Sequence, residues 1–366
     1  MCMHNVPTQT TGEVFAERML ELLNQGSLAV MISIGHRTGL FDAMGILPPA
    51  TSQQIADVAG LNERYVREWL GAMVTGRIVE YAADTKTYYL PPAHGMWLTR
   101  SAEENLARLM QYIPLMGQVE DRIVNVFQEG GGVPYAAYAR FQAVMAEDSD
   151  QAVVAPLLKA ILPLVPGLTE RLQQGVEALD VGCGRGRAMI TLAQAFPHSR
   201  FTGYDISVEG IGKAREEAAD LGLSNIRFAV QDAATFDAAE RYDLVTAFDA
   251  IHDQAFPAQV LSNIFHALQQ GGVFLMQDIA GSSYPEQNLD HPIAPFLYTV
   301  STTHCMTVSL AAGGVGLGTL WGKEKALEML AEAGFAAPRV EQLPHDFTNY
   351  YYIAHKPDEQ TSGAPV

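Results

Sequence analysis

The segment that most constrains this chain is residues 178–186, which read Ala-Leu-Asp-Val-Gly-Cys-Gly-Arg-Gly. Apolar residues around Asp180 predict the end of a buried strand, and the three alternate glycines predict a tight turn. The apolar periodicity from Arg187 onward predicts a helix. A strand, a glycine turn and a helix start make an anion- or nucleoside-binding site, because glycine lets the loop backbone approach a ligand beside the positive end of the helix.

The spacing of the glycines distinguishes this loop from the dinucleotide-binding fingerprint, which has the form G-x-G-x-x-G. Here Gly182, Gly184 and Gly186 alternate, and Asp180 stands two places before the first of them. This arrangement resembles that of class I S-adenosylmethionine (SAM) methyltransferases. The resemblance implies that SAM is the cofactor, that Asp180 helps to hold its methionine amino group, and that the loop lies close to its ribose and methionine parts.

Further carboxylates follow at successive strand ends. Asp205 comes roughly twenty residues later, where an acidic ribose partner is expected. The resemblance implies that Asp232 lies near the adenine amino group, that Ala233 offers a backbone N–H, and that Phe248 or Asp249 lies alongside. Each acid taken alone would also suit a helix cap or a turn. The three acids together with the loop favour a SAM site.

Residues 176–357 alternate predicted strands and helices, which is typical of an α/β domain with a doubly wound, mainly parallel, Rossmann-like sheet. The predicted strands end near Gly182, Asp205, Gln231, Phe248 and Asp278, and the helices begin near Arg187, Glu209, Phe256 and Lys323. Two last strands, around 338–342 and 350–354, are expected to form an antiparallel edge hairpin. Ligands of such sheets bind beyond the carboxyl ends of the strands, where the acids fall.

The N-terminal part predicts a winged-helix domain over residues 13–100. A helical pattern covers 13–44, residues 51–70 read as helix-turn-helix, and 78–81 with 87–90 read as a hairpin. Residues 101–175 predict a helical linker or lid, in which the aromatic segments 110–116 and 135–141 would suit either a lid or interdomain core.

A winged helix can read DNA, but the charges argue against that role. Glu63 and Glu68 alternate with Arg64 and Arg67, and the net charge is -18. We therefore expect neither a nucleic-acid partner nor a membrane partner. The resemblance to SAM-dependent O-methyltransferases implies that this domain makes the dimer contact and forms a wall of the partner's substrate pocket. The chain lacks both a signal-peptide pattern and an apolar run of the ~18 residues that a span needs, so we expect a cytoplasmic location. Its three cysteines are scattered and predict no metal site.

His252 and Asp253 follow the fourth predicted strand. Small-molecule O-methyltransferases carry a His-Asp pair at this place, and the resemblance implies that His252 is the general base, with Asp253 beside it. A histidine suits that task because its unperturbed pKa is ~6.5. Those families continue with Trp-Ser, whereas this chain continues with Gln254 and Ala255. The alternative is a histidine that packs against the sulfonium region.

The segment between the fifth predicted strand and the next helix would reach over the mouth of the active site. We expect acceptor contacts from Asp278, His304, Cys305 and His345. Taken together, the chain resembles a bacterial family of winged-helix SAM methyltransferases that are often catalogued as transcriptional regulators. The residues and the resemblance together predict a homodimeric enzyme that methylates a hydroxyl or thiol of a small molecule. The alternative is a SAM-binding regulator without turnover.

Overall fold

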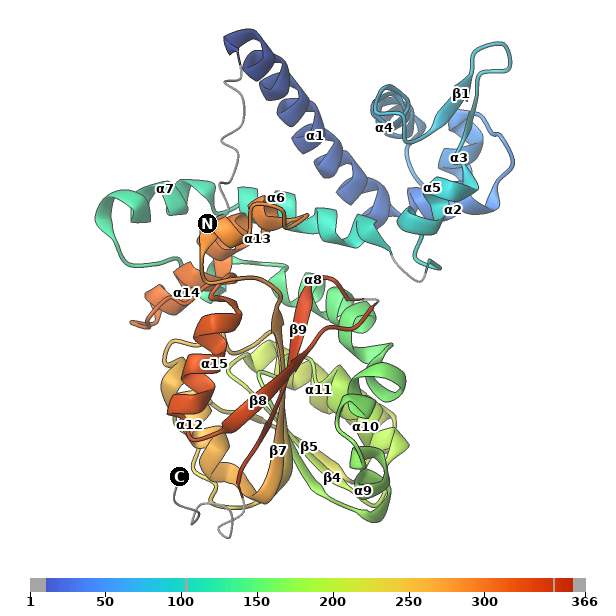
Figure 1. Ribbon diagram of the computed structural model, residues 1–366. Helices are drawn as coiled ribbons and strands as arrows, with labels where there is room; N and C mark the ends of the chain where they lie inside the picture. The colour runs from blue at the N-terminus through green and yellow to red at the C-terminus, as the bar shows by residue number, and fades with distance from the viewer. Residues whose placement is uncertain (1–10, 103–104, 345, 358–366) are drawn as a thin grey trace. The chain divides into compact units, whose positions relative to one another are not determined.

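The computed structural model describes residues 11–102, 105–344 and 346–357 (Figure 1). The chain forms two compact units, one up to Gly117 and one from Gln118 onward. The helical stretch predicted over 101–175 is therefore divided between the two units. Each unit is described by itself.

The first unit contains the winged helix that the sequence predicts. Its elements are α1 (Gly12–Thr38), α2 (Leu40–Ile46), α3 (Ser52–Ala59), α4 (Glu63–Thr75), the hairpin strands β1 (Glu80–Ala82) and β2 (Thr87–Tyr89), α5 (Pro92–Leu98), η1 (Leu106–Gln111) and α6 (Tyr112–Gly117). The helical pattern over 13–44 is two helices, because Gly39 adopts φ 73° and ends α1 with a left-handed cap. Thr51 and Gln54 form a capping box that starts α3.

Aromatic packing joins the helices of the first unit. The rings of Phe41 and Trp69 meet edge to face with centroids 5.2 Å apart, and both side chains are buried. The indole Nε1 of Trp69 donates to the carbonyl of Met31 at 2.8 Å, so this polar group is satisfied inside the core.

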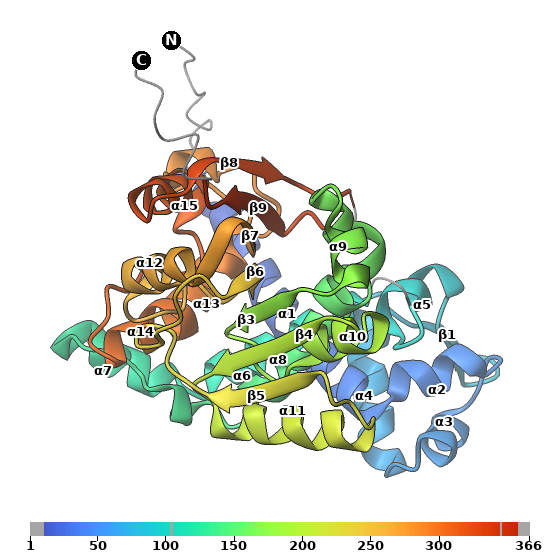
Figure 2. The same cartoon turned by 90° about the horizontal axis from the view of Figure 1, so that it is seen from below.

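A seven-stranded sheet forms the centre of the second unit (Figure 2). Its strands are β3 (Glu177–Val181), β4 (Arg200–Asp205), β5 (Ile226–Val230), β6 (Tyr242–Phe248), β7 (Leu268–Ile279), β8 (Ala336–Glu341) and β9 (Asn349–His355). The spatial order is β5-β4-β3-β6-β7-β9-β8, and only β9 pairs in the antiparallel sense, with β7 and β8. The predicted doubly wound sheet is confirmed.

Helices cover both faces of this sheet (Figure 2). The helices α9 (Leu168–Gln174), α10 (Arg187–Ala195) and α11 (Val208–Asp220) pack over one face, and α12 (Pro257–Ala267) and α15 (Gly322–Glu332) over the other. Along β7, Leu275 belongs to the first apolar core, whereas Phe274 and Met276 belong to the second. This alternation follows from the two-residue period of a strand.

The second unit also contains further helical segments, of which α8 and η3 line a cavity at the carboxyl ends of the strands. They are α7 (Glu120–Glu129), η2 (Tyr135–Ala137), α8 (Phe141–Ser149), η3 (Asp150–Val154), η4 (Leu157–Ile161), η5 (Leu162–Leu164), η6 (Pro285–Gln287), α13 (Ala294–Val300), η7 (Ser301–Cys305) and α14 (Met306–Ala311). The segments η3, η4 and η7 are π-helical, a conformation frequent at functional sites. Within the described ranges, no single helix has the length and apolar character to cross a membrane; one pair, Phe141–Leu164 with Leu168–Gln174, meets those criteria jointly but is bent by 107°.

Candidate active site

A cavity of about 100 Å³ lies over the glycine loop, at the carboxyl ends of β3 and β6. Five of the predicted cofactor residues and Gly182's neighbour Cys183 line it together with residues of α8, η3 and α10. The full lining is Gln142, Met145, Ala146, Asp148, Ser149, Ala152, Val153, Asp180, Gly182, Cys183, Gly184, Arg185, Arg187, Ala188, Phe248 and Asp249.

The glycines of the loop have two different reasons to be glycine. A Cβ on Gly184 would meet nothing closer than Gln142 Oε1 at 3.9 Å, on the side of the cavity. A Cβ on Gly186 would lie 2.4 Å from the ring of Phe228, and the residue has φ +71°. Gly184 therefore leaves room for a ligand, whereas Gly186 allows the loop to pack against Phe228 of β5.

Asp180 lies in β3 and is 3% exposed at the floor of the cavity. Its Oδ1 accepts a hydrogen bond of 2.7 Å from the hydroxyl of Thr246 on the neighbouring strand β6. Burial raises the pKa of Asp180 to about 7, against the opposing effect of the Thr246 hydrogen bond. A buried carboxyl with such a pKa favours a cationic ligand, which would restore its ionised form.

Asp205 lies behind the loop and does not line the cavity. Its Oδ2 accepts from the backbone N–H of Gly184 at 2.8 Å, and its Oδ1 accepts from Ser207 N–H at 2.7 Å. Burial raises its pKa, and these backbone donors oppose the rise. Asp232 and Ala233 follow β5 and are also outside the cavity lining: Asp232 is exposed and accepts from Ala234 N–H, while Ala233 is buried.

Asp249 follows β6 in a backbone conformation that non-glycine residues rarely adopt, with φ 49°. Its side chain lines the cavity beside Phe248, and its Oδ1 is buried without a hydrogen-bond partner. Burial raises the pKa of Asp249 well above its usual value, and the nearby carboxylate of Asp278 adds to the rise. Strain and an unpartnered buried oxygen at one residue indicate a functional position.

His252 is held by Asp278, the second-last residue of β7. The imidazole Nδ1 lies 2.8 Å from Asp278 Oδ1, which also accepts from Trp321 Nε1 at 2.9 Å and from the N–H of Ile279 at 2.9 Å. Burial alone would lower the pKa of His252, but the carboxylates of Asp278 and Asp253 outweigh it and raise the pKa well above its usual value. These contacts fix the orientation of the ring.

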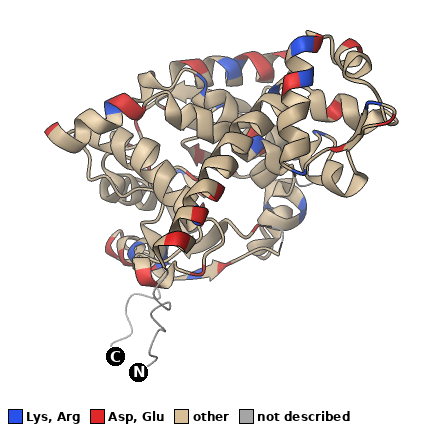
Figure 3. Cartoon of the chain, turned by 90° about the horizontal axis from the view of Figure 1, so that it is seen from above, with Lys and Arg blue, Asp and Glu red and all other residues tan. Residues whose placement is uncertain are grey.

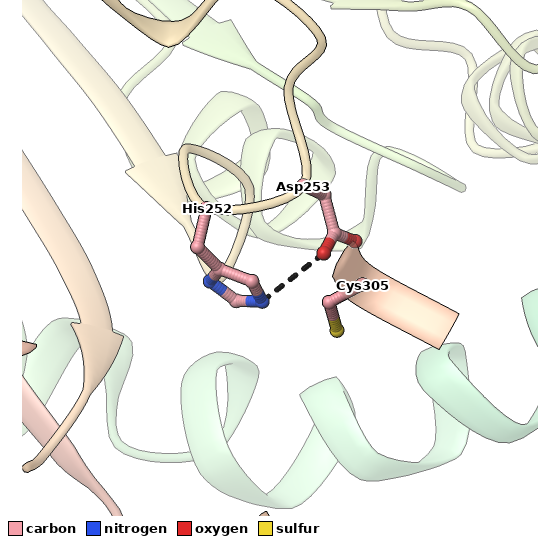
Figure 4. Close-up of side chains that lie close together, drawn as sticks. All are labelled: His252, Asp253 and Cys305. Atoms are coloured by element: carbon pink, nitrogen blue, oxygen red, sulfur yellow. Dashed lines mark ion pairs between the residues drawn. The ribbon is translucent and has the colours of Figure 1, made fainter. Parts of the chain in front are cut away.

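Asp253 and Cys305 lie at the other side of the imidazole (Figure 4). Asp253 Oδ1 is 3.2 Å from His252 Nε2, and His252 lowers the pKa of Asp253 to about 2 although burial opposes this. Burial and the nearby Asp253 raise the pKa of the Cys305 thiol to about 11. The cluster therefore combines an ionised carboxylate, an imidazole and a protonated thiol.

His304, next to Cys305, lies inside an aromatic cluster instead. Its ring stacks on Phe141 with centroids 3.5 Å apart and 11° between the planes, and Tyr135 and Tyr138 meet it edge on. The side chain is 2% exposed, and both ring nitrogens lack hydrogen-bond partners. Burial lowers the pKa of His304 to about 4, so it is neutral at neutral pH.

Several site residues are missing from the sequence prediction. The cavity wall formed by α8 and η3 follows the aromatic segment 135–141, for which the sequence left a lid and interdomain core as alternatives. Trp321 was not predicted as a partner of Asp278, and no local pattern in the sequence signals this pair, because 43 residues separate them. His345, the remaining predicted acceptor contact, lies outside the described residues.

The sheet order, the glycine loop and the acids at its strand ends define a class I SAM methyltransferase fold. Residues 172–334 match the family model of a methyltransferase domain, and residues 26–100 match that of an Rv2258c-like winged helix-turn-helix domain. The chain thus combines a class I SAM-dependent methyltransferase domain with a winged helix of the Rv2258c type.

Comparisons with individual proteins agree with this assignment. The chain is 30% identical over 159 residues to a trans-aconitate 2-methyltransferase of Methylobacterium radiotolerans, covering 43% of this chain and 54% of that protein. The chain thus spans only about half the length of this relative, and it spans 31% of the length of a second curated methyltransferase.

Solved structures show the same fold over nearly the whole chain. Human N-acetylserotonin methyltransferase in complex with SAM superimposes with a TM-score of 0.67 at 16% identity, covering 97% of this chain and 100% of that one. A candidate O-methyltransferase from Nostoc punctiforme PCC 73102 gives a TM-score of 0.71 at 19% identity, covering 95% and 100%.

Proposed function

We propose that the protein transfers a methyl group from SAM to a hydroxyl or thiol of a small-molecule acceptor. The observation that carries the proposal is the cavity over the glycine loop, with the Asp180 side chain and Asp249 Oδ1 buried in its lining. SAM supplies the methyl group on a positively charged sulfonium, and it also carries an ammonium group. A cationic ligand fits a cavity in which two buried carboxyls have raised pKa values and one carboxyl oxygen lacks a partner.

The chain's own residues divide the binding task. We propose Asp180 for the ammonium group, Gly182, Gly184 and Gly186 for the close backbone approach, and Phe248 and Asp249 for the adjoining wall. Asp205 would hold the ribose hydroxyls while it keeps its bond to Gly184 N–H, because a carboxylate has about four acceptor positions. Asp232 and Ala233 would contact the adenine.

Access to this cavity requires motion of its wall. At about 100 Å³ the cavity is smaller than the roughly 300–1,000 Å³ of most small-molecule sites. Asp150 in η3 and Arg187 at the start of α10 form an ion pair with Oδ2 and Nη1 2.6 Å apart. We propose that α8 and η3 move away from the glycine loop when SAM enters, and that this ion pair opposes the movement.

Removal of the acceptor's proton falls to His252 in this proposal. Asp278 acts as a positioning residue, because it holds Nδ1 and leaves Nε2 for the acceptor side, where Asp253 lies. A protonated imidazole cannot accept a second proton, and the two carboxylates raise the pKa of His252. Turnover should therefore increase with pH, and the midpoint of the increase should lie above the ordinary pKa of histidine.

The acceptor would lie between His252 and an aromatic cluster. The cluster consists of Tyr135, Tyr138, Phe141 and His304. The unpartnered ring nitrogens of His304 support a contact with a polar acceptor group. Cys305 and Asp278 lie beside His252 and would add polar contacts to the acceptor there. Incubating the protein with methyl-labelled SAM and a panel of phenols, thiols and carboxylates tests the proposal; label in none of these acceptors would contradict it.

The winged helix would serve in assembly of a homodimer. The N-terminal half of α1 exposes a run of large apolar side chains, which supports a covering partner: Val14, Phe15, Met19, Leu20, Leu22 and Leu23. Sedimentation analysis would give the oligomeric state, and a monomer at micromolar concentration would contradict this part of the proposal.

The alternative function is a SAM-binding transcriptional regulator without turnover. It is less well supported, because each arginine near the start of α4 is paired with a glutamate of the same helix: Arg64 with Glu68, and Arg67 with Glu63 at 3.4 Å. Basic and acidic residues are interspersed along the visible helices (Figure 3). A DNA shift assay at low and physiological salt separates the two functions, because a regulator must bind DNA in a salt-dependent way.

A further inference from the structure

Three potential metal ligands of different chemical type meet beside the proposed acceptor site. His252 and Asp253 lie on the loop after β6, and Cys305 ends the π-helical segment η7 (Figure 4). One ligand atom of each side chain lies within 4.8 Å of those of the other two. The side chains of His252 and Cys305 are buried, whereas 25% of the Asp253 side chain is exposed. An ion could therefore enter past Asp253.

A second observation at this cluster indicates a ligand. Asp253 Oδ1 is buried and has no aligned hydrogen-bond donor, although His252 Nε2 lies 3.2 Å away. Buried carboxylate oxygens are normally paired, because burial without a partner costs free energy. The same cluster thus has a buried carboxylate oxygen that contacts an imidazole nitrogen without an aligned hydrogen bond and lies close to a sulfur.

The surroundings of His252 also resemble those of a metal-ligating histidine. Asp278 Oδ1 lies 2.8 Å from Nδ1, and Trp321 Nε1 and the N–H of Ile279 hold the same oxygen. When Nδ1–H donates to Asp278, Nε2 presents its lone pair towards Asp253 and Cys305. A carboxylate behind the far nitrogen is the usual support of a histidine that binds a metal.

We propose that His252 Nε2, a carboxylate oxygen of Asp253 and Cys305 Sγ bind a divalent ion of the zinc type, with water as the fourth ligand. Bonds of about 2.0–2.1 Å at a tetrahedral angle place a nitrogen and an oxygen ligand about 3.3 Å apart, close to the observed 3.2 Å. The mixture of thiolate, imidazole and carboxylate favours Zn²⁺ over Mg²⁺ or Ca²⁺, which prefer oxygen ligands alone. Binding displaces the thiol proton of Cys305 and the proton of a protonated His252 from Nε2, and both are released to solvent.

The ion would inhibit methyl transfer. A metal on Nε2 takes the lone pair with which His252 would accept the proton of the acceptor, so the loaded cluster cannot act as the base. This consequence rests on the proposed function, whereas ion binding itself does not. The two can therefore fail independently.

Cobalt(II) titration of the metal-free, full-length protein tests the site. We expect one equivalent of Co²⁺ to give a thiolate-to-cobalt charge-transfer band, which one equivalent of Zn²⁺ abolishes by competition. The Cys305→Ser variant should lose this band and bind Zn²⁺ at least ~100-fold more weakly, more than is typical of a change behind a ligand.

A matched control removes the other two of the chain's three cysteines, Cys2 and Cys183. The double variant Cys2→Ser, Cys183→Ser should keep both the band and the one-to-one Zn²⁺ binding. Loss of the band in this control with retention in Cys305→Ser would overturn the proposal, as would the absence of stoichiometric binding in the unchanged protein. Circular dichroism of each variant shows that a loss of binding is not a loss of fold.

A second variant tests the role of Asp278. Asp278→Asn should keep the thiolate band but weaken Zn²⁺ binding by ~10–100-fold, because Asp278 positions the ligand without touching the ion. Inhibition is then measured as the ratio of methyl transfer with and without Zn²⁺ for each protein. Binding without inhibition would support the site and overturn its competition with His252.

Discussion

The pH dependence of SAM binding should follow the ionisation of Asp180. The carboxyl is buried at the floor of the cavity, and burial raises its pKa to about 7. If the ammonium group of SAM binds only the ionised form, the apparent Kd is the intrinsic Kd divided by the ionised fraction. That fraction falls from ~0.9 at pH 8 to ~0.01 at pH 5, since each pKa unit corresponds to a factor of ten. The Kd should therefore rise ~90-fold between these pH values, with affinity lost as the pH falls through about 7.

Equilibrium dialysis with labelled SAM measures this dependence. Asp180→Asn should bind SAM weakly and with little change between pH 5 and 8. Thr246→Val offers a matched test, because it removes the hydroxyl that donates to Asp180 Oδ1 and holds the pKa down. Its midpoint should move to higher pH. Asp220→Asn, an exposed acid at the end of α11, is the control and should leave the curve unchanged. A flat wild-type curve, or an unchanged slope in Asp180→Asn, would refute the reasoning.

Further predictions concern proton removal, entry and packing. His252→Ala should retain SAM affinity but lower turnover by ~100-fold or more, and wild-type turnover should rise towards alkaline pH; unchanged turnover would exclude His252 as the base. Asp150→Asn should speed SAM association in stopped-flow traces, because it removes the ion pair with Arg187; an equal or slower rate would argue against a wall that moves. Gly186→Ala should lower the free energy of unfolding by ~1–3 kcal/mol through contact with Phe228, and an unchanged denaturant midpoint would contradict this.

Local patterns made much of the methyltransferase domain predictable. The strand, glycine turn and helix around Gly182, and the acids at the following strand ends, are each encoded within about ten residues. These local patterns need no knowledge of distant contacts, so the sheet and the position of Asp180 at a strand end could be predicted from the sequence. The end of the first helix was predicted only as near Gly39 and Gly45, because a glycine either continues or ends a helix, and α1 ends at the first of them.

The parts of the site that join distant segments were not predictable in the same way. Met145 and Val153 line the cavity because α8 and η3 pack over the loop, which no periodicity in their sequence indicates. Cys305 lies at the end of the π-helical segment η7 and meets His252 from a distant part of the chain, and no local pattern in the sequence signals this contact. A sequence with scattered cysteines therefore predicted no metal cluster, whereas the fold brings one thiol beside a histidine and an acid.

Calorimetric titration of the purified protein with SAM, and separately with its demethylated product, directly tests whether the cavity over the glycine loop binds the methyl donor. We expect binding of one SAM per chain at pH 8, accompanied by a rise in the melting temperature. We also expect weaker binding of the product, which keeps the ammonium group proposed for Asp180 but lacks the sulfonium charge that the Asp249 carboxyl favours. The absence of heat and of any melting shift with both compounds would contradict the account.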